Sequence, residues 1–385
     1  MITKKNYNIV SLYVTVFIII ALITAYLPLW LKSYLYFENS EVGFVLASVG
    51  VLKFFSNFII TRKVQSINNL RNTIIAIIIS IIIVFIIISF FQTFINKQIN
   101  LILVLISLLI FSPVIPMVET IFNNTKNKFG RDYGKTRLSG SISFLITVFL
   151  ASTFFENYSL NYFPILFLGA SIIFLINAFQ IKKEYAPLKV VKYKNSFKRL
   201  IRQREYVSIL IICSLLQSSH AMYYSYSSIT WYDIGLSIEE IGLLWSIGVI
   251  AEVFLFYKIS KININKNYYS LINACCILTG VRWIGTYVLD NFYYLVFIQT
   301  LHAVSFGLTH YLMMYFIYKK IPSDLKLISQ VCYHGLSSGI ILTFLILCLS
   351  LYFSYFNDNK GYLLMAIVCI LSFFISYFSK RNSKR

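Results

Sequence analysis

Twelve apolar stretches of about membrane-spanning length fill most of this 385-residue chain. A bilayer core is about 30 Å thick, and a helix needs roughly 20 apolar residues to cross it. The runs are continuous rather than short and alternating, which excludes a β-barrel and leaves helices. The sequence therefore predicts an all-α membrane protein with twelve transmembrane helices, over residues 9–31, 41–61, 73–94, 99–121, 138–156, 161–181, 206–230, 239–260, 268–289, 292–318, 326–350 and 358–379.

The balance of hydrophobic and charged residues excludes a soluble globular domain. Hydrophobic residues make up 58% of the chain and charged residues only 12%, whereas a soluble domain carries about 25% charged residues. A chain this apolar needs lipid as its solvent. The six cysteines all lie inside apolar segments without metal-ligand spacing, so we expect small buried core residues.

The net charge of +20 would suit a nucleic-acid partner, but its distribution indicates membrane topology instead. Most Lys and Arg residues fall in alternate loops and at the termini, while the opposite loops carry only Lys32, Lys97 and Lys360. Positive loops stay on the cytoplasmic side of a membrane. The sequence therefore predicts a multi-pass protein of a bacterial cytoplasmic (inner) membrane, with both termini cytoplasmic, lipid contacts and no nucleic-acid partner.

The longest polar stretch, residues 182–205, is rich in Lys and Arg and predicts a cytoplasmic linker. It divides the chain into an N-terminal six-helix bundle, residues 1–181, and a C-terminal six-helix bundle, residues 206–385. An internal repeat supports the division, because Glu41-Val42-Gly43 opens one span and Glu240-Ile241-Gly242 opens its counterpart 199 residues later. Two such halves are typical of secondary transporters that bind substrate near the midplane.

A set of motifs in the second half is specific to one group of transporters. These motifs are Gln217-Ser218-Ser219-His220-Ala221, Tyr223-Tyr224, Ser227-Ser228, Trp231, Ile241-Gly242-Leu243-Leu244-Trp245-Ser246, Ala251-Glu252, Arg282-Trp283, Leu301-His302-Ala303 and Ser305-Phe306-Gly307-Leu308-Thr309-His310. On these residues, roughly 205–335, the chain resembles the bacterial 3-phenylpropionate transporter branch of the major facilitator superfamily. The first half matches more loosely, through Leu27-Pro28-Leu29-Trp30-Leu31-Lys32 and Tyr133-Gly134-Lys135-Thr136-Arg137.

The resemblance implies a secondary active transporter that works by alternating access. It implies proton-coupled uptake of a small organic solute such as an aromatic carboxylate like 3-phenylpropionate, with no cofactor and a monomeric protein. One stretch departs from the superfamily pattern. The loop motif G-x-x-x-D-[RK]-x-G-[RK] corresponds here to residues 57–65, where only Arg62 matches, so the resemblance does not decide whether this loop has the gating role of the motif.

Four ionisable side chains lie close to the midplane of their own spans in the second half. At 1.5 Å per residue, Glu252, Arg282, His302 and His220 each fall within about two helical turns of the bilayer centre. An ionisable group at that depth is costly unless it is paired, and it is a candidate for function. Their common depth indicates a substrate and proton site rather than scattered core residues.

Glu252 and Arg282 carry opposite charges on consecutive spans, and we expect them to pair. Two interpretations stay open: a buried ion pair that fixes packing, or a pair that opens when substrate or a proton binds. The arrangement is similar to lactose permease, in which Glu, Arg and His on the corresponding helices serve sugar binding and proton coupling. The further carboxylate of that permease, one turn after the His, is replaced here by Ser305.

Polar and aromatic residues on the same spans complete the predicted site. Gln217 and Tyr224 share a helix face with His220, and His302 and His310 are about 80° apart around an ideal helix. Each histidine also suits a satisfied position in the core. The predicted substrate-binding residues are Arg282, His220, His302, Gln217, Tyr224 and Trp245, and the predicted proton-coupling residues are Glu252, His220 and His310.

The first half contributes two intramembrane charges, Lys53 and Glu119. A structural pair between them is as compatible with the sequence as a contact with substrate. Neither these residues nor the histidines have the spacing of a metal site, because no H-x-x-x-H pair or adjacent carboxylate completes one. The sequence therefore predicts no metal.

Three other functions stay open from the sequence. A sugar or nucleoside proton symporter would share the fold and differ only in its solute. An integral-membrane enzyme would need a nucleophile or metal-binding carboxylates beside the histidines, and none is present, so we predict that the protein is not an enzyme. A non-transporting receptor would show no solute flux in proteoliposomes.

The charge asymmetry of the loops makes a direct prediction about topology. Reporter fusions placed at Lys194 and at Asn291 should report opposite sides of the membrane, because the first lies in a basic loop and the second in an acidic one. Alkaline phosphatase and green fluorescent protein fusions measure this. Reporters on the same side would show that the twelve-helix map is wrong.

Overall fold

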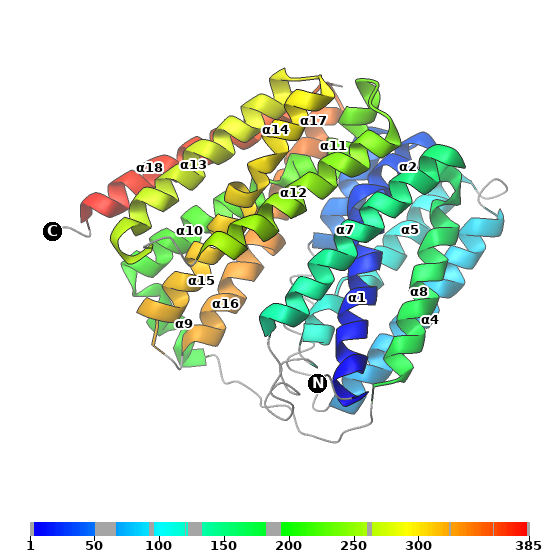
Figure 1. Cartoon of the computed structure of the whole chain (residues 1–385), viewed down its shortest axis with the longest axis horizontal. Coiled ribbons are helices and arrows are strands. Elements are labelled where there is room, and N and C mark those ends of the chain that lie inside the picture. Colours follow the sequence, from blue (N-terminus) through cyan, green and yellow to red (C-terminus); the bar gives the residue numbers. More distant parts are fainter. Residues whose placement is uncertain are drawn as a thin grey trace. The chain divides into compact units, whose positions relative to one another are not determined.

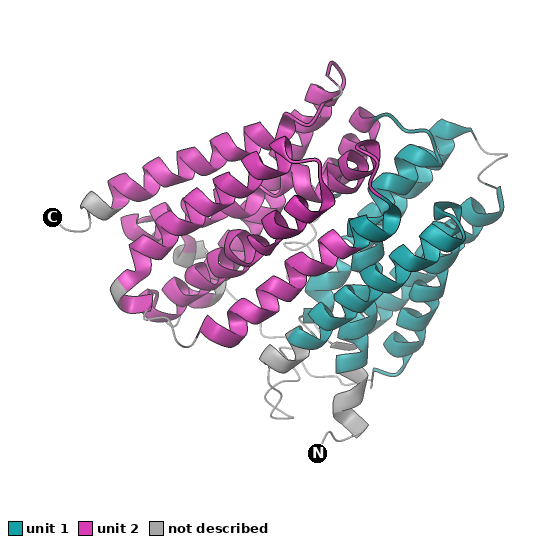
Figure 2. Cartoon of the chain, turned by 45° about the horizontal axis from the view of Figure 1, so that its top comes forward, with its two compact units in different colours: residues 1–38, 48–190, 237–242 teal, residues 39–47, 191–236, 243–385 magenta. Residues whose placement is uncertain are grey.

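The computed structural model describes residues 4–50, 67–91, 96–119, 121, 133–181, 194–259, 264–322, 325–356 and 358–382, and all the regular structure in these ranges is helical. By their contacts the residues form two compact units, which Figure 2 colours separately. Unit 1 contains Met1–Glu38, Ser48–Val190 and Ser237–Gly242, and unit 2 contains Asn39–Ala47, Val191–Leu236 and Leu243–Arg385.

Most helices of unit 1 are long (Figure 1). They are α1 (Lys4–Ala25), α2 (Leu27–Ser33), α4 (Ile67–Phe91), α5 (Lys97–Phe111), α7 (Tyr133–Asn157) and α8 (Phe163–Phe179). α1 packs on α7 and α8, and α4 packs on α8. Phe85 and Phe167 pack between α4 and α8 with ring centroids 4.1 Å apart, and Trp30 of α2 packs on Phe163 of α8 at 5.1 Å.

Unit 2 contains both long helices and shorter helical pieces. They are α9 (Lys194–Ile201), α10 (Arg204–Ser218), α11 (Ala221–Asp233), most of α12 (Ile238–Lys258), α13 (Ile264–Val288), α14 (Phe292–Thr300), α15 (Thr309–Lys320), α16 (Lys326–His334), α17 (Leu342–Phe353) and α18 (Gly361–Asn382). Two π-helical segments join them, η3 (Ala303–Leu308) between α14 and α15, and η5 (Gly335–Ile341) between α16 and α17. α13 packs closely on α18, and α10 lies beside α18, η5 and α15.

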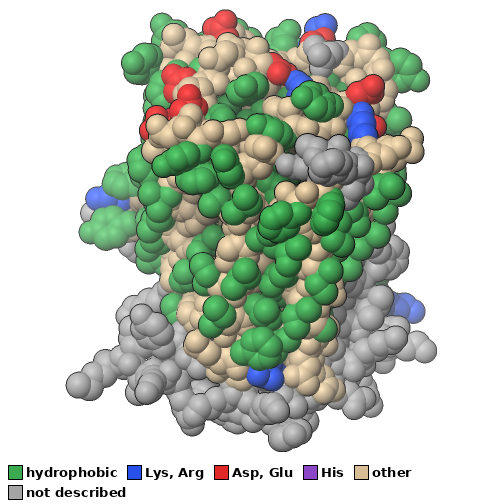
Figure 3. All heavy atoms as spheres, turned by 90° about the vertical axis from the view of Figure 1, so that its right-hand side faces the viewer, with side chains coloured by type: hydrophobic (Ala, Val, Ile, Leu, Met, Phe, Trp, Pro, Cys, Tyr) green, Lys and Arg blue, Asp and Glu red, His purple; other side chains and the backbone are tan. Residues whose placement is uncertain are grey.

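The membrane-spanning helices predicted from the sequence are confirmed for most of the chain. Ten helices of the described residues are long and apolar enough to span a membrane, or eleven if the bent pair Val10–Ala25 and Leu27–Ser33 is one span. The predicted span 41–61 runs beyond the described residues, so the total of twelve stays a prediction. Hydrophobic side chains also cover the middle of the face shown in Figure 3, as lipid requires.

The repeated motif found in the sequence has matching surroundings in the two units. A Cβ atom on Gly43 would collide with the Tyr226 hydroxyl and lie 2.8 Å from the Cβ atom of Ser350, all in unit 2. In unit 1, a Cβ atom on Gly242 would collide with a serine and lie 2.9 Å from the Tyr26 hydroxyl. Both glycines therefore allow a close helix approach that no larger residue permits.

Three helices of unit 2 are irregular and are joined to one another by side-chain hydrogen bonds. The first is interrupted at a turn between α10 and α11, and the other two contain the π-helical segments η3 and η5. At this turn Gln217 Nε2 donates to the Phe306 carbonyl oxygen at 2.9 Å, and Ser218 Oγ donates to the Ser337 carbonyl oxygen at 2.6 Å. π-helical turns leave the usual α-helical pattern and are frequent at functional sites.

The bond from Ser218 predicts a cost for removing its hydroxyl. Ser218→Ala should destabilise the protein by about 0.5–1.5 kcal/mol, because it removes the hydrogen bond between two helices, while the Ser337 carbonyl keeps the Leu342 N–H and Ser214 is the other acceptor near the Ser218 hydroxyl. The matched control is Ser372→Ala, since the buried Ser372 bonds only to Val368 of its own helix. The unfolding temperature in detergent measures both. An equal fall in unfolding temperature for the two variants would contradict a stabilising role for the bond between Ser218 and Ser337.

Candidate functional site

The guanidinium of Arg282 on α13 is the centre of the polar cluster in unit 2. The residue is fully buried, at 0% exposure. Its Nη1 atom lies 2.8 Å from Ser305 Oγ, 3.1 Å from His302 Nδ1 and 3.2 Å from His220 Nε2, and Nη2 donates to Gln299 Oε1 at 2.7 Å. All four partners are neutral or can be neutral acceptors, and among the described residues no carboxylate pairs with this cation.

Two aromatic rings cover the faces of the guanidinium. The Arg282 Cζ atom lies 4.6 Å from the ring centroid of Tyr223 and 4.6 Å from that of Trp283. Cation–π attraction is strongest for arginine when the pair is shielded from water, as it is here. Trp283 is held in place because its Nε1 atom donates to Ser219 Oγ at 2.9 Å, in the turn between α10 and α11. The break in this helix therefore helps to position the cation.

The bonds to Arg282 assign the tautomers of both histidines. His220 Nδ1 lies 3.1 Å from the Gln217 carbonyl oxygen and donates to it, which leaves Nε2 to accept from Arg282. His302 accepts from Arg282 through Nδ1, so its proton is on Nε2. That nitrogen lies 3.9 Å from Glu252 Oε2. Both rings are neutral in this arrangement, and His302 points its N–H group toward the carboxylate.

The expected direct pair between Glu252 and Arg282 is wrong. Glu252 on α12 meets His302, and its side chain keeps 19% of its surface exposed, whereas Arg282 is fully enclosed among neutral acceptors. The imidazole of His302 stands between the two charges, with one nitrogen toward each. Depth along a helix is readable from sequence, but the direction of a side chain around the helix is not.

Two glycines allow α12 to come close to the segment that carries His302. A Cβ atom on Gly248 would lie 3.3 Å from the Cβ and Cγ atoms of His302. A Cβ atom on Gly307 would lie 3.0 Å from Glu252 Cγ and 3.3 Å from Leu255 Cδ2. Both distances are tighter than an ordinary van der Waals contact. The approach of Glu252 to His302 therefore depends on the absence of side chains at these positions.

His302, Phe306 and His310 form a column of stacked rings. The His302 and Phe306 centroids are 5.3 Å apart with 5° between their planes, and those of Phe306 and His310 are 6.5 Å apart with 11°. The π-helical segment η3 lies between the two histidines, so the ideal α-helical angle does not apply. His310 also lies 5.8 Å from the ring of His334 on α16.

The other predicted substrate residues lie beside the same cluster. Tyr224 stacks on His220 at 5.6 Å, and Trp245 packs against Tyr223 at 4.3 Å and donates to Ser228 Oγ at 3.0 Å. The Gln217 amide donates to a backbone carbonyl. The structure thus places Arg282, His220, His302, Glu252, Gln217, Tyr224 and Trp245 in one region of unit 2, while His310 is joined to it through Phe306.

Several residues of the cluster were missed by sequence reasoning. Tyr223, Trp283, Ser305 and Gln299 all contact Arg282. Tyr223, Trp283 and Ser305 belong to the family motifs, but nothing in their spacing marks them as partners of a cation. Tyrosine is so frequent, with 29 in the chain, that Tyr223 could not be distinguished from a packing residue.

The sequence also predicts a role for two intramembrane charges of the first half. Glu119 lies in unit 1, at the end of the span Lys97–Glu119, and is only partly buried. Lys53 lies outside the described residues. Their predicted pairing therefore stays a prediction.

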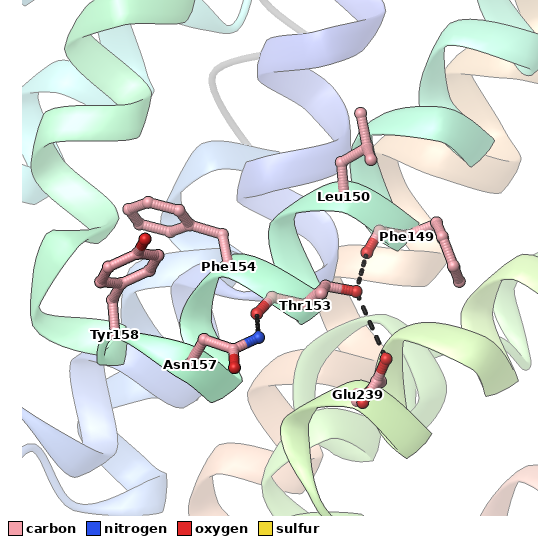
Figure 4. Close-up of a pocket in the computed structure, with 7 residues that line it drawn as sticks. All are labelled: Phe149, Leu150, Thr153, Phe154, Asn157, Tyr158 and Glu239. Atoms are coloured by element: carbon pink, nitrogen blue, oxygen red, sulfur yellow. Dashed lines mark hydrogen bonds between the residues drawn. The ribbon is translucent and has the colours of Figure 1, made fainter.

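An open cavity of about 550 Å³ lies in unit 1, on α7 at the start of α12. It is lined by Phe149, Leu150, Thr153, Phe154, Asn157, Tyr158 and Glu239 (Figure 4). Thr153 bonds weakly to Glu239 Oε1 at 3.4 Å, and the cavity holds none of the predicted site residues. Within the described part of the chain, no three His, Cys, Asp or Glu side chains gather as ligands for a metal.

Comparisons with known proteins agree on the class of protein. The model of the "MFS_1 like family" matches residues 7–344. The chain is 29% identical over 235 residues to the Escherichia coli protein named "Probable 3-phenylpropionic acid transporter", and 24% identical over 232 residues to "Uncharacterized transporter YwbF" of Bacillus subtilis. These alignments cover 60% and 59% of this chain, and only 61% and 57% of the two relatives.

Solved structures resemble the whole chain. The crystal structure of the nucleoside transporter NupG has a TM-score of 0.76 and 13% identity, and the alignment covers 100% of each chain. The D-xylose–proton symporter has a TM-score of 0.72 and 10% identity, over 98% of each chain. At such identities the likeness shows the fold alone.

The close approach at Gly307 makes a testable prediction. Gly307→Ala should destabilise the protein by about 1–3 kcal/mol, because the new methyl group displaces Glu252 and Leu255. The matched control is Gly280→Ala in α13, where the nearest atom to a Cβ, that of Cys369, is 3.7 Å away. This control should be neutral or stabilising by up to about 1 kcal/mol. Equal unfolding temperatures for the two variants would argue against close packing at Glu252.

Proposed function

Because the chain belongs to the MFS_1 like family and is a transporter of the major facilitator type, we propose that it takes up a small organic carboxylate together with protons, by alternating access. Its relatives and its fold are those of transporters rather than enzymes. The proposed solute class is an aromatic carboxylate similar to 3-phenylpropionate.

The observation that carries this proposal is the state of Arg282. A guanidinium buried at 0% exposure with only neutral acceptors around it keeps its charge uncompensated by any carboxylate among the described residues. A buried charge is costly unless it is paired. A substrate carboxylate supplies the missing negative charge, and it gains a charge-assisted hydrogen bond in return. An uncharged sugar or nucleoside would not supply this charge.

The aromatic part of the solute suits the residues next to the cation. Tyr224 and Trp245 have stacked rings 6.4 Å apart, on the same side of the cluster as His220 and Tyr223. Aromatic side chains bind planar apolar groups well because they bury area with few rotatable bonds. Gln217 and His302 then orient the carboxylate end. The Escherichia coli relative is named for 3-phenylpropionic acid, which carries such a phenyl group.

We assign the proton step to Glu252, with His302 as its neighbour. Glu252 is the carboxylate that meets the cluster and it keeps a partly exposed side chain, so a proton can reach it. Protonation neutralises Glu252, which makes its carboxyl group a weaker acceptor. The Nε2–H group of His302 can then turn toward another acceptor. His220 and His310 are further candidates, since histidine changes charge near neutral pH.

The cellular setting of the proposal follows from the sequence. We place the protein in the bacterial cytoplasmic membrane as a monomer in contact with lipid, with both termini cytoplasmic because the basic loops alternate with acidic ones. In this account residues 1–181 and 206–385 form the two halves that alternate, and residues 182–205 are the cytoplasmic linker.

Transport assays on three variants test the proposal. Glu252→Gln should abolish proton-driven accumulation of labelled 3-phenylpropionate but keep counterflow, because exchange needs no net proton movement. Arg282→Gln should lose both activities, since the anchor of the carboxylate is gone. Asp290→Asn, which removes an exposed carboxylate, is the matched control and should behave as wild type.

Accumulation and counterflow are measured in the same vesicles, from about pH 5.5 to about pH 8, where histidine and buried carboxyl groups titrate. Full pH-dependent accumulation by Glu252→Gln would contradict the assignment of the coupled proton to Glu252. Counterflow of a sugar or nucleoside, but not of any carboxylate, would replace the proposed solute.

A further inference from the structure

One edge of the Arg282 guanidinium makes a hydrogen bond through only one of its two nitrogen atoms. The Nε and Nη2 atoms of an arginine point the same way and form the fork that takes a carboxylate with two parallel bonds. Here Nη2 donates to Gln299 Oε1 at 2.7 Å, while Nε is buried and has no hydrogen-bond partner among the described residues. The Nε2 atom of Gln299 is also buried without a partner.

The remaining sides of the guanidinium are occupied. Nη1 is in contact with His220, His302 and Ser305, and the rings of Tyr223 and Trp283 lie against the guanidinium at 4.6 Å. An anion can therefore reach two donors of this cation together only along the Nε and Nη2 edge. Gln299 is the residue that stands at that edge.

The chemistry of an amide explains why both donors are left over. A carboxamide presents one oxygen to a cation, and its second group is an NH₂ that donates rather than accepts. Gln299 therefore satisfies Nη2 and cannot satisfy Nε, whereas a carboxylate has an acceptor for each. Buried donors without partners are rare in native proteins and call for an explanation such as a ligand.

We propose that Gln299 holds the place of the substrate carboxylate at Arg282 and gives way to it. In the bound state the carboxylate oxygens accept from Arg282 Nε and Nη2, and the Gln299 side chain turns aside. The inference rests on the proposed function, since the anion is the transported solute. Gln299 then determines specificity for a carboxylate over a neutral solute.

The position of Gln299 allows this exchange. It lies in the last turn of α14 (Phe292–Thr300), just before the chain changes into the π-helical segment η3 (Ala303–Leu308). A helix that ends at this point does not fix the side chain from both sides, and π-helical turns commonly accompany functional sites. Gln299 is buried at 0% exposure, and the bond to Arg282 is its one side-chain hydrogen bond among the described residues.

A carboxylate introduced at position 299 tests the inference directly. Gln299→Glu should occupy the fork permanently, so that the detergent-purified full chain gains thermal stability without ligand and binds 3-phenylpropionate at least about tenfold more weakly than wild type. Gln299→Leu, which keeps the volume but frees the fork, should bind 3-phenylpropionate within about threefold of wild type. Thermal unfolding and calorimetric titration measure the two effects.

The outcomes distinguish this inference from the proposed function. If wild type and Gln299→Glu bind 3-phenylpropionate equally, the anion binds elsewhere and the role of Gln299 is wrong, while carboxylate transport stands. Loss of binding in Gln299→Leu would show that Gln299 itself holds the ligand. This result would contradict the displacement of Gln299 by the carboxylate, even if Gln299→Glu did not fold. If wild type binds neither 3-phenylpropionate nor benzoate, the anionic substrate itself is wrong and the inference falls with it.

Discussion

The burial of the Arg282 guanidinium among neutral acceptors is the constraint on which the rest of unit 2 depends. Removing such a cation from water costs several kcal/mol, and hydrogen bonds and aromatic faces must offset that cost. Ser305, His302 and His220 share one nitrogen of the guanidinium, and Tyr223 and Trp283 lie against it. What these groups do not provide is a negative charge, and this is the property that a transporter of anions needs in its resting site.

The irregular helices of unit 2 serve the same cluster. The turn between α10 and α11 contains Ser219, which bonds to Trp283, and His220, which contacts Arg282. The π-helical segment η3 follows His302 directly and contains Ser305, which lies beside His220. Gln217 and Ser218 bond to backbone carbonyls of η3 and η5, so the three interruptions support one another. Each interruption is stabilised by a side chain of another helix. The irregular segments are therefore held in place by the contacts that form the site.

Much of the fold and the membership of the site can be predicted from sequence, but not the contacts within it. Long apolar runs can only be helices in lipid, and charges at midplane depth are too costly to be incidental. The expected Glu252–Arg282 pair is wrong because His302 lies between the two charges, and the π-helical segment between His302 and His310 could not be predicted from their spacing. Gln299 escaped notice because a single amide in an apolar span carries no pattern.

The most direct test of the account compares a carboxylate with its neutral counterpart. Calorimetric titration of the purified wild-type protein should give 3-phenylpropionate at least about a tenfold lower Kd than 3-phenylpropanol, because a charge-assisted hydrogen bond to a buried cation contributes about 1.5–3 kcal/mol. In Arg282→Gln the two ligands should bind equally weakly. Equal affinity of wild type for the acid and the alcohol would contradict the claim that Arg282 awaits a substrate carboxylate.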